Sequence, residues 1–243
     1  EPVAENLESL QRFVRATDAD VGIAHDGDAD RAIFVDEDGR HIEGETSFAA
    51  LAAAEIAADD VVVSAVNVSQ RIVDVVSAAG ADLELTPIGS THLITRIRDL
   101  ERADVHVPIA GEGNGGILFP DYRIARDGAY TAARFLELLA DRSASDVADD
   151  YRGYTMVRAN VEYDDEDERT AMLEAAESYA ETTDAELTTL DGYRLDYGDA
   201  WVLARPSGTE PLVRLYAEAR NEARADRLLE AYRDAIVAGG SGE

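Results

Sequence analysis

The sequence predicts an α/β fold: a helix-covered, mostly parallel mixed sheet in the first part, followed by a smaller α+β domain. Between residues 20 and 140, short apolar runs of strand length alternate with segments of helical apolar spacing. Such alternation is typical of parallel sheets that are covered by helices. Beyond residue 153 the order changes, because a long strand precedes a helix, and four more runs of strand type then precede a final helix.

The first part begins with helical apolar spacing at residues 4–16 and a buried-type strand at 20–25. A hairpin arm follows at 32–36 and ends in the turn DEDG. Asp127 is expected to be the N-cap of the last helix, because a carboxylate at that position accepts a hydrogen bond from the first turn. The other elements expected here are helices at 46–57, 69–79, 90–100 and 127–140, strands at 61–66 and 105–111, and a strand with a terminal loop at 82–89.

The polar stretch 142–152 separates the two parts and is expected to be a linker. After it, strands are expected at 154–163, 185–189, 193–196, 200–205 and 212–219, and helices at 166–182 and 221–237. The last residues, GGSGE at 239–243, are expected to be a disordered or remnant tail.

The chain is strongly acidic, with 51 acidic and 22 basic residues and a net charge of −29. All 22 are arginine, and the absence of cysteine excludes disulfides. A solvated acidic surface of this kind suits high salt, where counterions screen self-repulsion, so we expect a halophilic source. The sequence offers no basic stripe for nucleic acid, no membrane-spanning apolar stretch and no signal-peptide pattern, so a cytoplasmic protein is expected.

The loop HDGDADR places carboxylates at alternate positions directly after a strand. Asp26, Asp28 and Asp30 would supply the hard oxygen ligands that Mg²⁺ prefers. Arg31 can compensate only one of the three negative charges, so the loop calls for a further cation. The plain alternative, in so acidic a chain, is a solvated acidic turn.

Two other kinds of site fit part of this spacing. Glu37 completes the oxygen positions of an EF-hand loop, but Arg31 stands where the sharp turn needs glycine, and a strand follows instead of a helix. A haloacid-dehalogenase-type phosphatase also has Asp-x-Asp after an apolar strand, with Asp26 as nucleophile and Asp28 as acid. That chemistry normally uses a downstream lysine, which this chain lacks, so the phosphatase is kept as the alternative.

The loop GEGNGG follows the strand expected at 105–111. Its glycines permit tight backbone geometry and close approach of a ligand. Glu112 offers an acceptor and Asn114 both a donor and an acceptor, a pair suited to vicinal sugar hydroxyls. The alternative is an ordinary glycine-rich connection, and the GxGxxG spacing of a dinucleotide site is not met.

The loop ARPSGTEP lies between two strands of the last domain. Arg205 supplies a bidentate fork, Ser207 and Thr209 supply hydroxyls, and Gly208 exposes a backbone N–H. Together they would form a concave phosphate cradle without a helix or a lysine. The alternative is a Pro-Gly turn, which would need neither the arginine nor both hydroxyls.

The three loops together describe one substrate, a sugar phosphate, and the chain resembles the α-D-phosphohexomutases over nearly its whole length. This superfamily comprises phosphoglucomutase, phosphomannomutase and phosphoglucosamine mutase. HDGDADR resembles its metal-binding loop, GEGNGG its sugar-binding loop and RPSGTEP its phosphate-binding loop. The most specific stretch is GYRLDYGDAWVLARPSGTEP, and TPIG (86–89) and RDGAYTAARFLELL (126–139) support it.

The resemblance implies an enzyme that moves a phosphoryl group between C1 and C6 of a hexose or hexosamine phosphate, through a bisphosphate and with Mg²⁺ as cofactor. The roles that it implies are metal binding by Asp26, Asp28 and Asp30, catalysis by Arg31, sugar binding by Glu112, Asn114 and Gly89, and phosphate binding by Arg205, Ser207, Gly208 and Thr209. His41 and His106 are expected to be structural.

The resemblance also implies a division of the chain. Residues 1–43 would be the end of a second domain with the metal-binding loop, 44–141 a third domain, and 153–238 a fourth, TATA-binding-protein-like domain. The phosphoserine motif of the first domain, similar to TASHNP, has no counterpart here. That missing domain is therefore the expected partner, and this chain is expected to be inactive by itself. The contrasting hypothesis is a non-catalytic sugar-phosphate-binding module.

Overall fold

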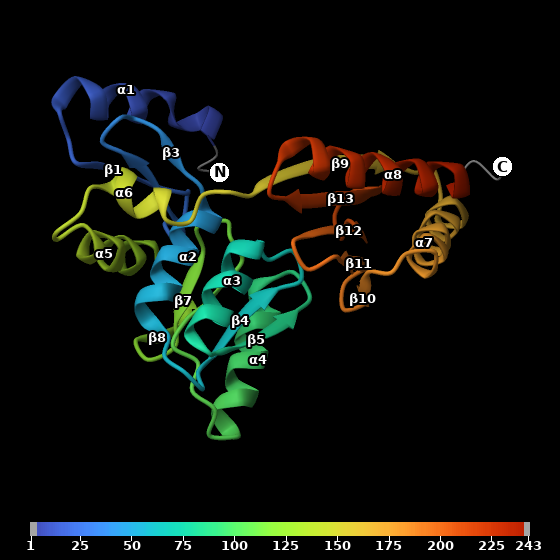
Figure 1. Cartoon of the computed structure of the whole chain (residues 1–243), viewed down its shortest axis with the longest axis horizontal. Helices are drawn as coiled ribbons and strands as arrows, with labels where there is room; N and C mark the ends of the chain where they lie inside the picture. The colour runs from blue at the N-terminus through green and yellow to red at the C-terminus, as the bar shows by residue number, and fades with distance from the viewer. Residues whose placement is uncertain (1–3, 241–243) are drawn as a thin grey trace. The chain divides into compact units, whose positions relative to one another are not determined.

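The computed structural model describes residues 4–240 and divides the chain into two compact units, Glu1–Arg152 and Gly153–Glu243. Figure 1 shows the elements of both units along the chain. Unit 1 contains η1 (Ala4–Leu7), α1 (Glu8–Thr17), β1 (Val21–His25), β2 (Ala32–Asp36), β3 (His41–Ile42), α2 (Gly44–Glu55), β4 (Val61–Ala65), α3 (Gln70–Ala79), β5 (Asp82–Thr86), α4 (Ser90–Arg102), β6 (Ala110–Gly111), β7 (Ile117–Phe119), β8 (Arg123–Arg126), α5 (Gly128–Leu138) and α6 (Ala144–Asp149).

The first strands of unit 1 form a small antiparallel sheet in the order β1-β2-β3. His25 pairs with Ala32, so residues 26–31 form the loop of a hairpin. Helix α1 covers this sheet, and its buried Val14 packs with Ile33 and Val35 of β2. The sheet thereby holds the aspartate-rich loop on a rigid base.

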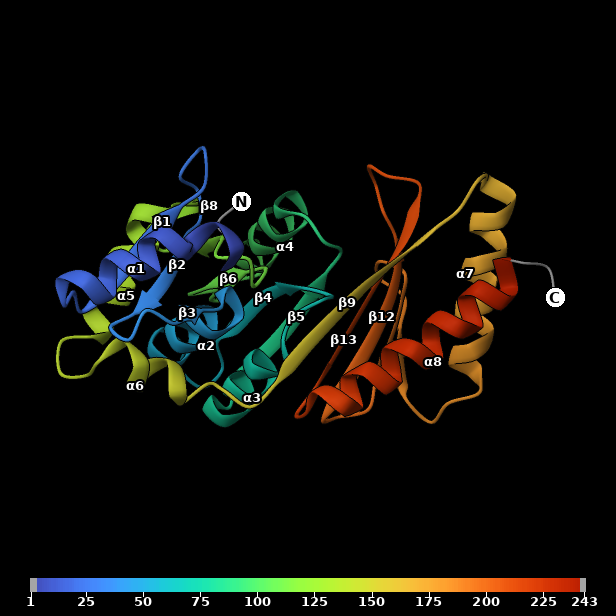
Figure 2. The same cartoon turned by 90° about the horizontal axis from the view of Figure 1, so that it is seen from above.

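The larger sheet of unit 1 is mixed, with the order β5-β4-β6-β7-β8. Strand β4 pairs in parallel with β5 and β6, whereas β6–β7 and β7–β8 are antiparallel. Successive residues of β4 belong to different cores on the two faces of the sheet: Val62 packs with α2 and α3, and Val63 packs with α4. Helices therefore cover both faces, which confirms the helix-covered mixed sheet expected from the sequence; Figure 2 shows the same elements from above.

One core crosses the division expected at residues 43 and 44. Phe34 of β2 stacks on Phe135 of α5, with ring centroids 4.0 Å apart. The same cluster contains Ile42 of β3 and Phe48 of α2, all buried. The small sheet and the larger sheet thus pack as one compact unit.

The segment 142–152 differs from the expected linker, because it contains the helix α6. Ser143 caps it by accepting a hydrogen bond from Asp146 N, and Ala144, Val147 and Ala148 are buried in the core of unit 1. Three small apolar residues at helical spacing are enough to anchor this polar segment. The tail expected at 239–243 is also corrected in part, since α8 extends to Gly240; residues 241–243 lie outside the described residues.

Unit 2 is a five-stranded antiparallel sheet in the order β10-β11-β12-β13-β9. Helices α7 and α8 pack on each other and against this sheet (Figure 2). Their buried Met172, Ala176 and Tyr232 share a core with alternate residues of the strands, as expected for a smaller α+β domain. The elements are β9 (Thr155–Glu162), α7 (Glu166–Glu181), β10 (Glu186–Thr188), β11 (Tyr193–Asp196), β12 (Ala200–Pro206), β13 (Leu212–Ala219) and α8 (Glu222–Gly240).

None of the helices within residues 4–240 combines the length and the apolar character that crossing a lipid bilayer requires.

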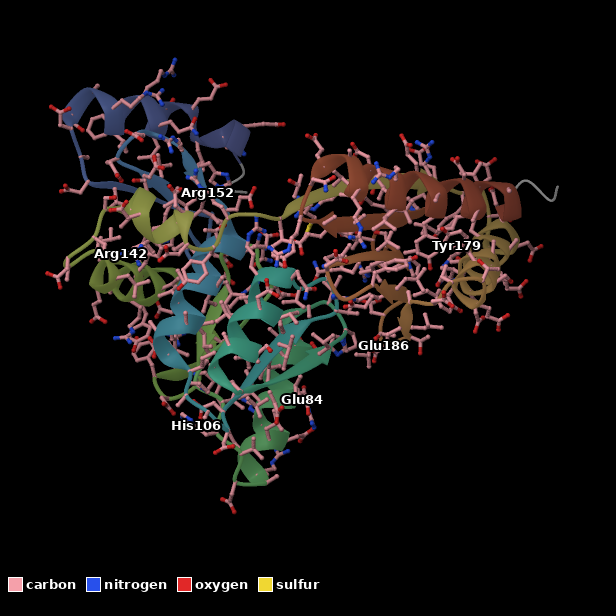
Figure 3. The ribbon with its side chains drawn as sticks, viewed as in Figure 1. Glu84, His106, Arg142, Arg152, Tyr179 and Glu186 are labelled. Atoms are coloured by element: carbon pink, nitrogen blue, oxygen red, sulfur yellow. The ribbon has the colours of Figure 1, made fainter. Side chains whose placement is uncertain are left out.

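His106 joins separate segments at one end of unit 1 (Figure 3). Its Nδ1 lies 2.7 Å from Asp60 Oδ1 and its Nε2 lies 3.2 Å from Asp121 Oδ2. Hydrogen bonds to these two carboxylates raise the pKa of His106 above its usual 6.5, because they favour the protonated ring. The histidine is therefore structural in this geometry, and its stabilising effect depends on pH.

Replacing His106 with glutamine should cost stability only at lower pH. A raised pKa in the folded state means that the stabilisation is fully present below the unfolded pKa, near 6.5, and is lost as pH rises through the folded value. The melting temperatures of wild type and His106→Gln should therefore differ most at acidic pH and converge at alkaline pH. A difference that stays constant from acid to alkaline pH would contradict this prediction.

Candidate active site

The aspartate loop, residues 26–31, is a six-residue hairpin connection. Asp26 O accepts from Ala29 N at 3.1 Å, and Ala29 adopts a left-handed φ of 57°. Asp26 Oδ1 accepts from Arg31 N at 3.2 Å, and His25 Nδ1 lies 2.7 Å from Arg31 O. These local bonds fold the loop back on itself, so its alternate side chains converge.

The structure brings Asp26, Asp28 and Asp30 together, with one carboxylate oxygen of each within 4.8 Å of the others. Arg31 Nε lies 3.3 Å from Asp26 Oδ2 and 3.7 Å from Asp30 Oδ1. Three carboxylates so close repel one another, and an all-oxygen set of this kind fits Mg²⁺. The donor chemistry therefore agrees with the divalent cation that the sequence predicts.

The EF-hand alternative is wrong, because Glu37 lies beyond β2 and away from the aspartates in the fold. Its carboxylate accepts hydrogen bonds from Ser145 N at 3.1 Å and from the Ser145 hydroxyl at 2.5 Å. Strand β2 separates it from the loop, whereas an EF-hand needs this oxygen in the same coordination shell.

The glycine-rich loop, residues 111–116, joins β6 to β7 and lies against the aspartate loop. Ala32 N, at the start of β2 directly after the aspartate loop, donates to Gly115 O at 3.0 Å, so the glycine-rich loop is bonded to the base of the hairpin. Asn114 is exposed, and its Oδ1 accepts from Gly116 N at 3.0 Å. Its side-chain amino group is thus oriented by the loop and remains a donor for a ligand.

Glu112 is the most buried side chain of the predicted sugar-binding residues, at 8% exposure. Its Oε1 accepts from Gly89 N at 2.7 Å, so the structure brings together the two residues predicted from separate loops. Gly89 has a φ of 128°, a conformation that side chains rarely adopt, and it begins α4.

Arg126 was not among the predicted site residues. It ends β8, and its Nη2 lies 2.5 Å from Asp30 Oδ2 while its Nη1 lies 3.7 Å from Glu112 Oε2. One guanidinium therefore connects the aspartate loop to the glycine-rich loop. In the sequence Arg126 stands just before the helix cap Asp127 and opens the supporting stretch RDGAYTAARFLELL, and neither fact points to these distant partners.

The loop at 207–211 connects β12 and β13 in unit 2. Ser207 N donates to Leu212 O at 2.8 Å and Thr209 N donates to Ser207 Oγ at 3.4 Å, so Ser207 shapes the turn. The loop lines an open hollow of about 530 Å³ together with the start of α7. That wall is acidic, with Asp164, Asp165 and Glu166, and opposes anion binding at low salt.

Arg205 precedes this loop and is held by a residue that the sequence analysis missed. Its Nε lies 3.0 Å from Asp191 Oδ2, and the two side chains are 14% and 16% exposed. Gly192, with a φ of 83°, brings Asp191 here, because a Cβ on it would lie 2.1 Å from Ala204 O. Asp191 engages the Nε edge of the guanidinium, so the terminal amino groups are the ones positioned to meet a phosphate.

Comparisons with known proteins show the family to which a chain with this fold and these loops belongs. The family model described as phosphoglucomutase/phosphomannomutase, alpha/beta/alpha domain II, matches residues 1–39. The models for alpha/beta/alpha domain III and for the C-terminal domain match residues 44–154 and 156–235. The chain belongs to the α-D-phosphohexomutase superfamily.

Curated relatives carry names from the same family. A phosphoglucomutase/phosphomannomutase of Thermococcus kodakarensis is 36% identical over 234 residues, covering 95% of this chain and 50% of the relative. A probable phosphoglucosamine mutase of Methanopyrus kandleri is 39% identical over 241 residues, covering 97% of this chain and 52% of the relative. The chain thus spans about half the length of the curated relatives that it matches.

A solved structure has the same fold. The crystal structure of a phosphoglucomutase/phosphomannomutase family protein from Burkholderia thailandensis superimposes with a TM-score of 0.81 at 27% identity, covering 97% of this chain and 50% of that one. The family that these models show is the one that the sequence resembles.

Proposed function

We propose that this chain forms the metal-, sugar- and phosphate-binding portion of a phosphohexomutase, which moves a phosphoryl group between C1 and C6 of a hexose or hexosamine phosphate. The observation that carries the proposal is the contact between the aspartate loop and the glycine-rich loop. Arg126 contacts a carboxylate of each loop, and Gly115 O accepts from Ala32 N directly after the aspartate loop. A cation site directly beside a hydroxyl-binding loop suits phosphoryl transfer to a sugar hydroxyl.

Asp26, Asp28 and Asp30 would hold Mg²⁺, whose positive charge, when bound, would offset the negative charge on the transferring phosphoryl group. Arg31 lies beside this site and would stabilise the same group through its guanidinium. In-line positioning and charge neutralisation account for most of the catalysis in such transfers, so these residues need no nucleophile of their own.

Glu112 and Asn114 would bind the sugar hydroxyls, and Gly89 would hold Glu112 in place through its N–H. Arg205, Ser207, Gly208 and Thr209 would bind the phosphate that does not react. Glucose, mannose and glucosamine phosphates are the proposed substrates. A bisphosphate intermediate would turn between two transfers, which explains why one sugar needs two phosphate positions.

The family resemblance implies a phosphoserine donor in a motif similar to TASHNP, and residues 1–243 contain no such motif. We therefore propose that residues 1–243 bind hexose phosphate but do not turn it over by themselves. The net charge of −29 supports a protein adapted to high salt, and we propose that it acts in the cytoplasm.

The full-length product of the encoding gene should convert glucose 1-phosphate to glucose 6-phosphate with Mg²⁺, once primed with glucose 1,6-bisphosphate. Phosphorus NMR of the same reaction with residues 1–243 should show binding without conversion and without free phosphate. Mannose 1-phosphate and glucosamine 6-phosphate, tested in parallel, would rank the substrates. Release of inorganic phosphate by residues 1–243 would instead support a phosphatase and contradict the mutase.

A further inference from the structure

Arg126 contacts charged side chains of both the aspartate loop and the glycine-rich loop. Its guanidinium is 19% exposed and contacts Asp30 through Nη2 at 2.5 Å and Glu112 through Nη1 at 3.7 Å. Glu112 in turn accepts the Gly89 N–H through its other oxygen. A continuous chain of charged and polar contacts thus runs from a predicted cation ligand to a predicted sugar ligand.

The surrounding backbone leaves room for this arginine. A Cβ on Gly116 would lie 2.6 Å from Arg126 Cδ and 3.2 Å from its Nη1, so any side chain there would displace the guanidinium. The glycine-rich loop is therefore shaped around Arg126 as well as around a ligand.

We propose that Arg126 is a positioning residue that couples cation binding at the aspartate loop to the placement of Glu112. This proposal rests on the proposed function only for the identity of the sugar that Glu112 would bind. The contacts on which the coupling depends lie wholly within unit 1. Arg126 and a divalent cation compete for the same Asp30 carboxylate, and Arg126 gives up part of its Asp30 contact when the cation binds. The guanidinium then moves closer to Glu112, its other anionic partner.

The competition predicts the direction in which Arg126 changes the affinity of the aspartate loop for a cation. A positive charge on Arg126 a few ångströms from the aspartates opposes a cation there, so Arg126 lowers cation affinity while it holds Glu112. Coupling between two sites is reciprocal: if cation binding positions Glu112 and so strengthens the binding of a ligand there, that ligand must strengthen cation binding by the same factor. A purely structural arginine would act differently, because its loss would loosen the loop and weaken both sites.

The first test is a titration with Mn²⁺ followed by electron paramagnetic resonance at fixed ionic strength. Arg126→Met keeps the length of the side chain and removes its charge, and should bind Mn²⁺ about tenfold more tightly than wild type. Arg123→Met is the matched control on the same strand, since Arg123 contacts Asp127 and not the aspartate loop, and should leave the affinity unchanged. A triple Asp26→Asn, Asp28→Asn, Asp30→Asn variant measures binding elsewhere on this acidic chain.

The second test monitors Gly89, which is linked to Asp30 through Glu112 and Arg126, in the absence of sugar. In wild type, Mg²⁺ should shift the NMR signal of the Gly89 amide, because that N–H reports on Glu112. The shift should be lost in Arg126→Met and restored in Arg126→Lys, which keeps a positive charge. If Arg126 had only a structural role, the charge of the replacing side chain would not decide whether Mg²⁺ shifts the Gly89 signal.

Unchanged or weaker Mn²⁺ binding by Arg126→Met overturns the coupling, as does a Gly89 shift that persists in that variant. A wild type that binds no Mn²⁺ above the triple variant overturns it as well. Hexose phosphate binding is measured in a separate experiment. If the protein did not bind hexose phosphate, the proposed function would be contradicted, but the Mn²⁺ titration and the Gly89 signal would still decide the role of Arg126.

Discussion

Replacing Arg205 with alanine should weaken the binding of glucose 1-phosphate to residues 1–243 by about tenfold or more. Charge-assisted hydrogen bonds contribute roughly 1.5–3 kcal/mol each, and about 1.4 kcal/mol corresponds to a factor of ten in affinity. The structure adds a second penalty, because Arg205→Ala removes the cation 3.0 Å from the Asp191 carboxylate, whose negative charge then repels a phosphate more strongly. Calorimetric titration of the wild type and the variant measures the difference.

Two further variants separate these contributions. Arg205→Ala combined with Asp191→Ala should bind glucose 1-phosphate better than Arg205→Ala alone, since the repelling carboxylate is gone. Arg233→Ala is the matched control in the same unit, because Arg233 contacts only the neighbouring Asp234 on α8, and should bind like wild type. Equal affinity of wild type and Arg205→Ala would show that the loop is only a turn between two strands.

Gly128→Ala should reduce the affinity of the aspartate loop for Mn²⁺ by about tenfold or more. A Cβ on Gly128 would lie 2.4 Å from Arg31 O and 2.7 Å from Ala29 O, which are backbone atoms that cannot rotate away. The variant would also strain the bond from Gly128 N to Ala29 O, now 3.1 Å. The loop must therefore shift, and displacements of even an ångström matter for a shared coordination site.

Gly27→Ala is the control within the same loop, because a Cβ on Gly27 would meet nothing within 4 Å. It should retain the Mn²⁺ affinity of wild type. Binding of glucose 1-phosphate through Arg205 should persist in Gly128→Ala, since that contact lies in unit 2. If the two glycine variants bound Mn²⁺ equally well, the carboxylate geometry would not be set by this packing.

The regular elements were predictable because their apolar periods are local. The consecutive valines of β4 and the helical spacing of α3 and α4 appear directly in the sequence, and the position of Asp127 alone predicts the cap of α5. Residues 105–111 were expected to form a full strand, yet only Ala110–Gly111 pairs as β6. Pro108 lacks the N–H that a ladder needs, which limits the pairing of this segment.

Short and polar elements escaped prediction for a different reason. Helix α6 has only three buried residues, and β7 and β8 are short strands joined by a tight turn. These elements form because distant segments supply the core against which they pack, and local propensity says little about such packing. The local pattern therefore predicts a linker at 142–152 and indicates no strand at β7 or β8.

The candidate site was predictable as three loops but not as a set of contacts. The aspartates, Glu112 and Arg205 stand out by residue type and spacing. Arg126 and Asp191 do not, because each acts through a partner far away in the sequence, Asp30 and Arg205 respectively. Non-local ion pairs become visible only when the fold places the elements.

The ion pair between Asp191 and Arg205 bears on kinetics. Asp191 lies against the Nε edge of the guanidinium and offsets part of its charge before any phosphate arrives, so a phosphate at the terminal amino groups is attracted less strongly than it would be without this carboxylate. Affinity differences among similar contacts appear mainly in the dissociation rate, so a small gain means a short residence time. In the proposed reaction the sugar phosphate must leave this loop, turn and return within each cycle. A resident counter-anion would thus keep release from limiting turnover.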